Sequence, residues 1–255
     1  MTIVRRLVAV ALVSLCFQVV LAGPLDQCQE YVRYGTPSDK GDLLCRTGYA
    51  LAHNPEHKTP DWVAERLTRE KATAARARSN DFRPDPDLAP GRRAELSDYK
   101  NSGYDRGHMA PAGNMRWDAD AMSESFYLSN MSPQIGPGMN RGIWKDLEEK
   151  VRTWAVKRGE LYIFTGPVYK DVPKKTIGPN HVAVPTHFYK IIFDPVRVEA
   201  IAFLLPNKTI KTKDLSRYLV SVDEVEAQTG LDFLSNIDKP IQKLVESRKA
   251  GGVWE

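Results

Sequence analysis

The sequence has little surplus charge of either sign. Its 255 residues include 36 Lys and Arg against 32 Asp and Glu. Two of these basic residues, Arg5 and Arg6, lie in an N-terminal segment that we expect to be removed, which leaves an excess of only two positive charges. Bulk charge therefore gives no argument for nucleic-acid binding, and such a case must depend on local clusters of charge.

Several common signatures of enzymes are absent. The sequence contains no Gly-x-Ser-x-Gly elbow, no glycine-rich phosphate loop and no His-Glu-x-x-His zinc motif. These absences argue against a serine hydrolase of the elbow type, a P-loop nucleotide hydrolase and a zinc protease. The sequence also lacks internal repeats and low-complexity tracts, as expected of an ordinary globular domain.

Long hydrophobic runs are lacking except at the N-terminus. The run Leu7–Leu21 follows two arginines and ends at Val20-Leu21-Ala22, where a small residue suits a signal peptidase. The run is too short for a membrane span. We therefore expect residues 1–22 to be a signal peptide and residues 23–255 a single domain. The protein is then periplasmic or secreted, without membrane contact after cleavage; the alternative is an uncleaved anchor.

Cysteine is scarce, with three in the chain. Cys16 lies in the signal, and export into an oxidising compartment predicts a disulfide between Cys28 and Cys45. Closing this loop is worth about 3 kcal/mol in the chain-entropy model. The alternative is a zinc site that adds His53 and His57, but its spacing matches no usual zinc pattern.

The apolar pattern predicts an α+β fold with a central, mainly antiparallel sheet flanked by helices. Four runs are expected to form strands of that sheet: Leu161–Phe164, Val182–Val184, Tyr189–Phe193 and Ala200–Leu205. Two further strands are expected at Gly48–Ala50 and Phe126–Asn130. The segment Pro60–Leu67 fits either a helix or a strand, and Arg76–Pro90 reads as an irregular, exposed loop.

Two helices are expected in the second half of the chain. Apolar residues recur at helical spacing from Asn140 onward, and Gly159 stands where a C-terminal glycine is expected. The segment Val222–Gln228 is predicted to be a shorter helix, capped by Ser221 together with Glu224. The chain after about residue 247 is expected to be loose.

The segment Tyr99–Asn114 has the composition of a site rather than of a core. Within it, His108 can accept a proton from water because imidazole titrates near neutral pH. Arg106 can bind a phosphate through two hydrogen bonds, while Gly107 allows a close approach or a sharp turn. Asp105 can hold this loop in place. From chemistry alone, however, a histidine in a polar loop is more often an ordinary surface residue.

Asn140 and Glu148 are candidates for binding a divalent cation. Position alone favours Asn140 as a helix N-cap, but an amide oxygen is also a good ligand for Mg²⁺, which keeps several waters. Glu148 lies about 12 Å further along an ideal helix, at about 1.5 Å per residue. It would therefore act through a metal-bound water; the alternative is a solvated helix face.

Together these segments resemble the DNA/RNA non-specific endonucleases, the family of endonuclease G and of secreted bacterial nucleases. The resemblance covers roughly Tyr49–Gly230. It is carried by these segments in this order: Trp62–Glu65, Asp105–His108, Asn114, Tyr127–Gln134, Asn140–Glu148 and Thr165–Pro167. It implies a ββα-metal finger active site.

The resemblance also implies roles for individual residues. His108 would be the general base and Asn140 the direct ligand of Mg²⁺, for which Mn²⁺ or another divalent cation can substitute. Glu148 would be a water-bridged metal residue. Arg106 would contact phosphate, and Asn130 would help to shape the site.

One implied arginine and one departure concern the charge around the site. The family uses an arginine upstream of an aromatic and Pro/Asp segment; we choose Arg78, with Arg76 and Arg83 as alternatives. Arg141 departs from the family, where many members have glutamine or a similar polar residue. This departure places an extra positive charge beside the expected metal.

The activity implied is that of a Mg²⁺-dependent, sugar-non-specific endonuclease. It would bind DNA and RNA through the phosphate backbone. Water would attack the phosphorus in line with the leaving oxygen, and the products would carry 5′-phosphate ends. Groups that touch only phosphate and metal cannot read base edges, so substrate choice is expected to be broad. The resemblance also permits a homodimer. The alternatives are a secreted nucleic-acid-binding module without catalysis and a phosphodiesterase of small nucleotides.

Overall fold

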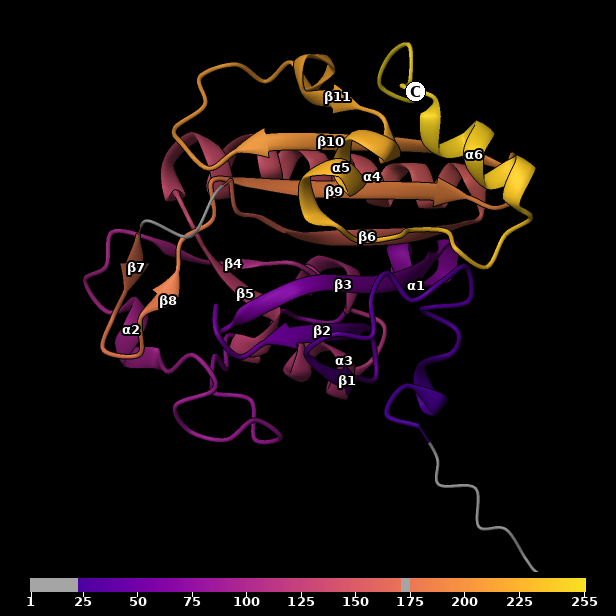
Figure 1. The fold of residues 1–255 in the computed structure, drawn as a ribbon. Coiled ribbons are helices and arrows are strands. Elements are labelled where there is room, and N and C mark those ends of the chain that lie inside the picture. The colour runs from indigo at the N-terminus through magenta and orange to yellow at the C-terminus, as the bar shows by residue number, and fades with distance from the viewer. Residues whose placement is uncertain (1–22, 171–174) are drawn as a thin grey trace, which may run out of the picture.

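A seven-stranded antiparallel sheet forms the centre of the protein. A computed structural model describes residues 23–170 and 175–255. The strand order is β1-β2-β3-β6-β9-β10-β11, and every neighbouring pair is antiparallel (Figure 1). These strands are β1 (Asp42–Cys45), β2 (Ala50–Asn54), β3 (Thr59–Thr68), β6 (Glu160–Val168), β9 (His187–Asp194), β10 (Glu199–Pro206) and β11 (Leu219–Val220).

Two small ribbons and several helices surround this sheet. One ribbon pairs β4 (Asp105–His108) with β5 (Met131–Gln134), and the other pairs β7 (Thr176–Ile177) with β8 (Val182–Ala183). The α-helices are α1 (Arg69–Thr73), α2 (Leu96–Tyr99), α3 (Ala119–Glu124), α4 (Lys145–Arg158), α5 (Val222–Thr229) and α6 (Lys239–Ser247). The other helical segments are η1 (Asp26–Cys28), η2 (Ala112–Asn114), η3 (Leu128–Asn130), η4 (Gly136–Trp144) and η5 (Leu215–Tyr218).

Each face of the central sheet is covered by helices. Side chains alternate between the two faces along a strand, so Val63 of β3 packs with Val151 of α4 while its neighbour Trp62 packs on the opposite side. That opposite side is covered by Val225 of α5 and Val245 of α6. Figure 1 shows α5 and α6 in front of the sheet and α4 behind it. The predicted α+β class with a mainly antiparallel sheet is confirmed.

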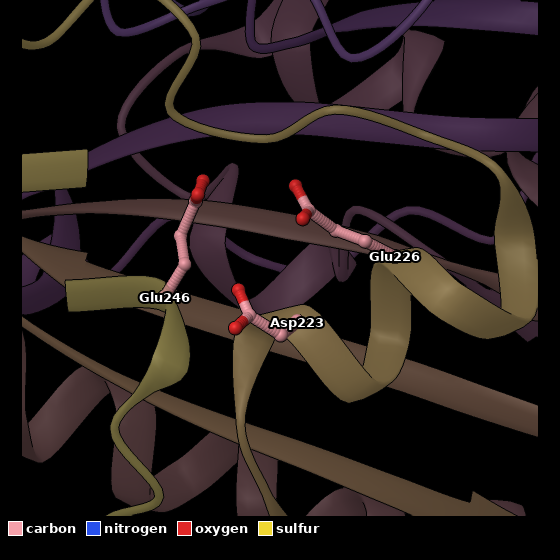
Figure 2. A group of neighbouring side chains, drawn as sticks. All are labelled: Asp223, Glu226 and Glu246. Atoms are coloured by element: carbon pink, nitrogen blue, oxygen red, sulfur yellow. The ribbon is translucent and has the colours of Figure 1, made fainter. Parts of the chain in front are cut away.

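Helices α5 and α6 bring three carboxylates together on the face opposite α4. Oxygens of Asp223, Glu226 and Glu246 lie within 4.8 Å of one another (Figure 2). Burial raises the pKa of Glu246 to about 7, and Gln242 donates a hydrogen bond to it. The raised pKa favours the neutral carboxyl of Glu246, which lessens the repulsion from its acidic neighbours.

The helices confirm two predictions and correct two others. Gly159 ends α4 with φ 99°, and Ser221 with Glu224 forms a reciprocal cap at the start of α5. The expected helix start at Asn140 is wrong, because Gly138 and Gly142 have non-helical backbone angles and regular α-helix begins at residue 145. The chain end is not loose: Trp154 donates a hydrogen bond to the carbonyl of residue 254, and the two indole rings pack together.

Several strand predictions also need correction. Pro60–Leu67 belongs to a strand, and the strand expected at Gly48–Ala50 begins only at residue 50. Val182–Val184 contributes to the β7–β8 ribbon rather than to the central sheet. Phe126–Asn130 is a turn with a short helix, and its backbone pairs through a single bridge between Tyr127 and Arg83. The Asn130 side chain bonds to the backbone of Ala110 and Ser125.

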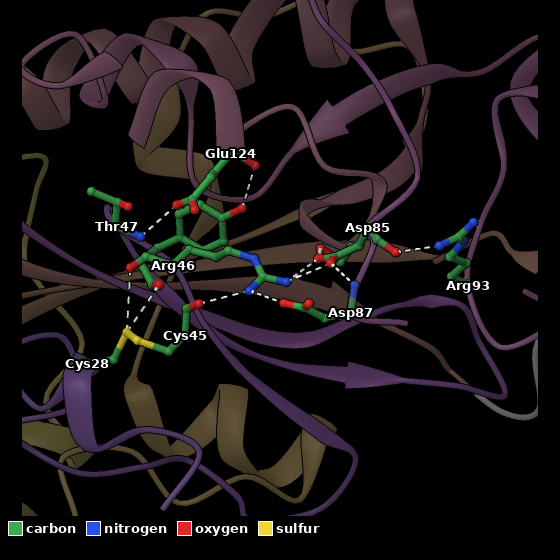
Figure 3. Close-up of polar contacts among 10 residues, drawn as sticks. Cys28, Cys45, Arg46, Thr47, Asp85, Asp87, Arg93 and Glu124 are labelled. Carbon is green, nitrogen blue, oxygen red and sulfur yellow. Dashed lines mark hydrogen bonds and ion pairs between the residues drawn. A yellow bond between two sulfur atoms is a disulfide. The ribbon is translucent and has the colours of Figure 1, made fainter. Parts of the chain in front are cut away.

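The disulfide between Cys28 and Cys45 is confirmed, and it lies beside a buried ion pair (Figure 3). Arg46 donates to both carboxylate oxygens of Asp85 at 2.7 Å, and Asp85 is fully buried. The loop Arg76–Pro90 is therefore irregular as predicted, but it is anchored into the fold rather than wholly exposed.

The zinc alternative fails with the disulfide, since bonded sulfurs cannot serve as thiolate ligands. The predicted signal peptide, with Cys16, lies outside the described residues, and the single domain over residues 23–255 stays a prediction. No helix in the part of the chain that the structure describes is long and apolar enough to cross a membrane.

Candidate active site

A cavity of about 860 Å³ collects most of the predicted site residues. It lies where the β4–β5 ribbon meets η2, η4 and the first turns of α4. Its walls are formed by Arg78, Phe82, Leu96, Tyr99, Lys100, Tyr104, Asp105, Arg106, His108, Pro111, Ala112, Gly113, Asn140, Arg141, Lys145, Glu148 and Arg152. The predicted base, metal ligand, water-bridged carboxylate and two arginines are therefore brought together, whereas Arg76 and Arg83 do not line the cavity.

His108 is held at the end of β4 by pairing with Met131 of β5. Its ring packs edge-on against Phe126, with ring centres 5.0 Å apart, and only 9% of the residue is exposed. Burial, together with the positive charges of Arg78 and Arg106, lowers the pKa of His108 to about 3. The imidazole is therefore neutral at physiological pH and has a free lone pair with which to accept a proton.

Two guanidinium groups flank this histidine. Arg106 lies over the ring of Phe82 at 4.0 Å, and Arg78 lies over Phe126 at 4.9 Å. Stacking on an aromatic ring orients a guanidinium while its edge remains available for bidentate binding of phosphate. Arg83, in contrast, is paired with Asp81, donates to Ser123 and is not among the residues that line the cavity.

Gly107 is required by close packing rather than by a turn. A Cβ atom at this position would overlap the side chain of Gln134, a buried residue of β5. Asn130 then fixes the chain that follows His108, because its side chain bonds to both the backbone N–H and the carbonyl of Ala110. The two residues hold the histidine strand in register.

Asn140 is oriented by Asp105 and does not cap a helix. Its Nδ2 atom donates to Oδ2 of Asp105 at 2.9 Å, and the same carboxylate is paired with Arg141 at 3.1 Å. The N-cap of α4 is Trp144. Within residues 23–170 and 175–255, the Oδ1 atom of Asn140 has no hydrogen-bond partner, so this oxygen is available on the cavity wall.

Glu148 adds a carboxylate to the same wall from the first turn of α4. Burial raises its pKa to about 7, although the positive charges of Lys190 and Arg152 act in the opposite direction. A free amide oxygen and an ionisable carboxylate are the hard donors that a Mg²⁺-sized cation prefers. The donor set therefore fits a divalent metal. The separation expected for an ideal helix does not apply, because the backbone is broken at Gly142.

Sequence reasoning missed Arg152 and Phe82. Arg152 lies four residues after Glu148, a spacing that places both side chains on one face of a helix, so the sequence could have predicted that the two lie together. The orientation of the Arg152 side chain could not be predicted, because it depends on a hydrogen bond to the distant Asn114. Phe82 carries no chemistry of its own and is recognised only from its contacts with Arg106 and His108.

Comparisons with known proteins agree with this geometry. The family model described as DNA/RNA non-specific endonuclease matches residues 28–239. The chain belongs to this family. Nuclease C1 of Cunninghamella echinulata var. echinulata is 38% identical over 82% of this chain and 89% of its own length, and endonuclease G of Caenorhabditis elegans is 39% identical over 88% and 78%. A solved complex of endonuclease G with its inhibitor EndoGI has a TM-score of 0.78 and 36% identity, over 84% of this chain and 93% of that one.

Membership in this nuclease family settles the class of reaction. The protein is a non-specific DNA/RNA endonuclease, a phosphodiester hydrolase that depends on a divalent metal and takes nucleic acid as substrate. The alternative prediction, a nucleic-acid-binding module without catalysis, is therefore wrong. The roles of single residues are not decided by the family match and remain predictions.

The relatives contradict the prediction of a periplasmic or secreted protein. Endonuclease G of Caenorhabditis elegans and of Homo sapiens, and the related nucleases of Schizosaccharomyces pombe and Saccharomyces cerevisiae, are named mitochondrial. These names point to mitochondria instead. The prediction failed because an apolar run behind two arginines indicates targeting in general without identifying the compartment.

Proposed function

We propose that this endonuclease uses Mg²⁺, cuts DNA and RNA alike, and leaves 5′-phosphate ends. The observation that carries the proposal is the shared cavity of His108, Asn140 and Glu148, with arginines on its walls. A general base, hard oxygen ligands and cationic groups are what phosphodiester hydrolysis needs, because a water must be deprotonated and negative charge must be neutralised.

His108 is proposed as the general base. Its neutral ring can take a proton from water at physiological pH. A phosphate that enters the cavity offsets the positive charge of Arg78 and Arg106, which raises the pKa of the histidine in the complex and strengthens it as a base. Phe82 and Phe126 both pack against this ring.

Arg78, Arg106 and Arg152 are proposed to bind the phosphate and stabilise charge in the transition state. All three line the cavity that also contains His108. Guanidinium groups match phosphate oxygens through paired N–H donors. None of them reads a base edge in this role, which supports hydrolysis of both DNA and RNA without sequence preference.

Asn140 is proposed to hold the metal directly through Oδ1, with Glu148 acting through a bound water. Asp105 supports this role by fixing the amide so that its oxygen faces the cavity. When bound, a divalent ion supplies charge neutralisation on the phosphate and stabilisation of the leaving oxygen. Mg²⁺ suits a site with few protein ligands, and Mn²⁺ is proposed as a substitute.

Digestion of plasmid DNA and of total RNA tests this proposal. The protein is incubated with Mg²⁺ or with EDTA, beside His108→Ala, and product ends are labelled with and without prior phosphatase. We expect degradation of both nucleic acids with Mg²⁺ only, loss of activity in the variant, and ends that need phosphatase before labelling. Hydrolysis confined to small nucleotide diesters would instead support the alternative phosphodiesterase.

A homodimer is also proposed, and light scattering after gel filtration tests it.

A further inference from the structure

Two charged residues lie inside the apolar layer between the central sheet and α4. Glu65 of β3 is 3% exposed and Lys190 of β9 is 1% exposed. Both occur on the sheet face that packs against α4, where neighbouring side chains such as Val63 and Ile192 are apolar. Buried charges are costly and persist beside functional sites more often than elsewhere. The proposed mechanism uses neither of them.

A chain of hydrogen bonds leads from Glu65 to the cavity wall. Both carboxylate oxygens of Glu65 accept from Nδ2 of Asn114 at 3.1 Å. The Oδ1 atom of Asn114 accepts from Nη1 of Arg152 at 3.2 Å. Asn114 is 2% exposed, whereas Arg152 lines the cavity. The buried carboxylate is therefore connected to a cavity arginine through one amide.

We propose that Glu65 and Asn114 are positioning residues that fix the guanidinium of Arg152 before the phosphate arrives. The inference rests on the proposed phosphate-binding role of Arg152. An amide has one donor end and one acceptor end, and the carboxylate holds the donor end. The acceptor end of Asn114 must then face Arg152.

The surroundings of Arg152 support a prearranged guanidinium. A Cβ atom on Gly113 would lie 2.7 Å from Nη1 of Arg152, so the glycine leaves the space that this group occupies. Lys190 donates to Thr165 at 2.7 Å and compensates the charge of Glu65 across the buried layer. Holding a long side chain in its bound conformation lowers the entropy lost on binding. Glu65 and Asn114 thus strengthen phosphate binding without touching the substrate.

Salt-dependent DNA binding in a His108→Ala background tests this inference without relying on activity. Affinity for a labelled DNA duplex is measured by fluorescence anisotropy over a range of salt concentrations. The slope of log K against log salt is negative, and the loss of one phosphate contact reduces its magnitude by about 0.9. We expect this decrease for Arg152→Met, most of it for Asn114→Ala, and no further decrease in the double variant. A merely structural role for Asn114 predicts additive losses of affinity and an unchanged slope.

Three further variants sharpen the test. Gly113→Ala displaces the guanidinium but leaves the bonds between Glu65 and Asn114 intact, and it should weaken binding about as much as Asn114→Ala. Glu65→Gln keeps the shape but removes the charge, and it should give a smaller decrease. Lys157→Met removes an exposed cation at the far end of α4 and should change neither slope nor affinity. Thermal unfolding of each variant checks that the fold is kept.

The outcomes separate this inference from the proposed function. If Arg152→Met reduces the magnitude of the salt slope but Asn114→Ala, Gly113→Ala and Glu65→Gln leave it unchanged, the positioning role is overturned while the phosphate role of Arg152 stands. If Arg152→Met itself leaves the slope unchanged, both roles are overturned. The general base and metal site are tested separately by digestion.

Discussion

Replacing Glu148 with glutamine is predicted to stabilise the metal-free protein at pH 8. Burial raises the pKa of this carboxyl from its ordinary 4.5 to about 7. The unfolded chain ionises first, so the folded state loses stability as the pH rises from about 4.5 through 7. Each tenfold change in an acid constant is worth ~1.36 kcal/mol, which gives an upper bound of about 3 kcal/mol for Glu148.

The free energy of unfolding is expected to rise by about 1–3 kcal/mol, below the upper bound at its low end because the carboxylate lies on a cavity wall that is partly open to water. Urea unfolding in EDTA measures it, at pH 8 and again at pH 5, where the gain should fall below about 1 kcal/mol. Added Mg²⁺ should stabilise the wild type more than the variant. Glu149→Gln, an exposed neighbour, is the control and should change stability by less than about 0.5 kcal/mol. A variant that is less stable at pH 8, or equally stabilised at both pH values, refutes the reasoning.

Three other variants, which remove the disulfide, a buried ion pair and an aromatic contact, are tested by urea unfolding. Replacing Cys28 and Cys45 by serine should lower the free energy of unfolding by about 3 kcal/mol, because the disulfide closes a loop of 17 residues. An unchanged urea midpoint of unfolding would contradict this. Arg46→Met should lower the free energy of unfolding by about 3–5 kcal/mol, because it removes the counter-ion of the buried Asp85 carboxylate and leaves it only the hydrogen bonds from Ser129 and the Asp87 N–H. Trp254→Ala should cost about 2 kcal/mol by uncovering the indole it packs on, and a neutral effect would show that the chain end is loose after all.

The chemistry of the site could be read from the sequence because it is local. His108 and Arg106 lie two residues apart on one strand, and Asn140 and Glu148 lie eight residues apart in the consecutive elements η4 and α4. Short spacing of this kind survives errors in the predicted secondary structure. Even though regular helix begins later than expected, both metal-site candidates still line the same cavity.

Features that depend on distant contacts could not be read. Asp85 belongs to a loop rich in proline and charge, and it is buried because it pairs with the distant Arg46 and accepts a hydrogen bond from the distant Ser129. The strand expected at Phe126–Asn130 is wrong for a related reason, since this segment is held by a single bridge to Arg83 and by side-chain bonds from the buried Asn130 to Ala110. Pattern alone does not show which polar side chains take the place of backbone partners.

The central claim divides the work between His108 as base and Asn140 as metal ligand. Its most direct test measures plasmid cleavage and Mg²⁺-induced thermal stabilisation on the same samples of His108→Ala and Asn140→Ala. The account predicts that His108→Ala loses cleavage by at least about a hundredfold yet is stabilised by Mg²⁺ like the wild type. It predicts that Asn140→Ala loses both cleavage and the stabilisation. A His108→Ala protein that still cleaves at the wild-type rate, or an Asn140→Ala protein that still responds fully to Mg²⁺, would contradict it.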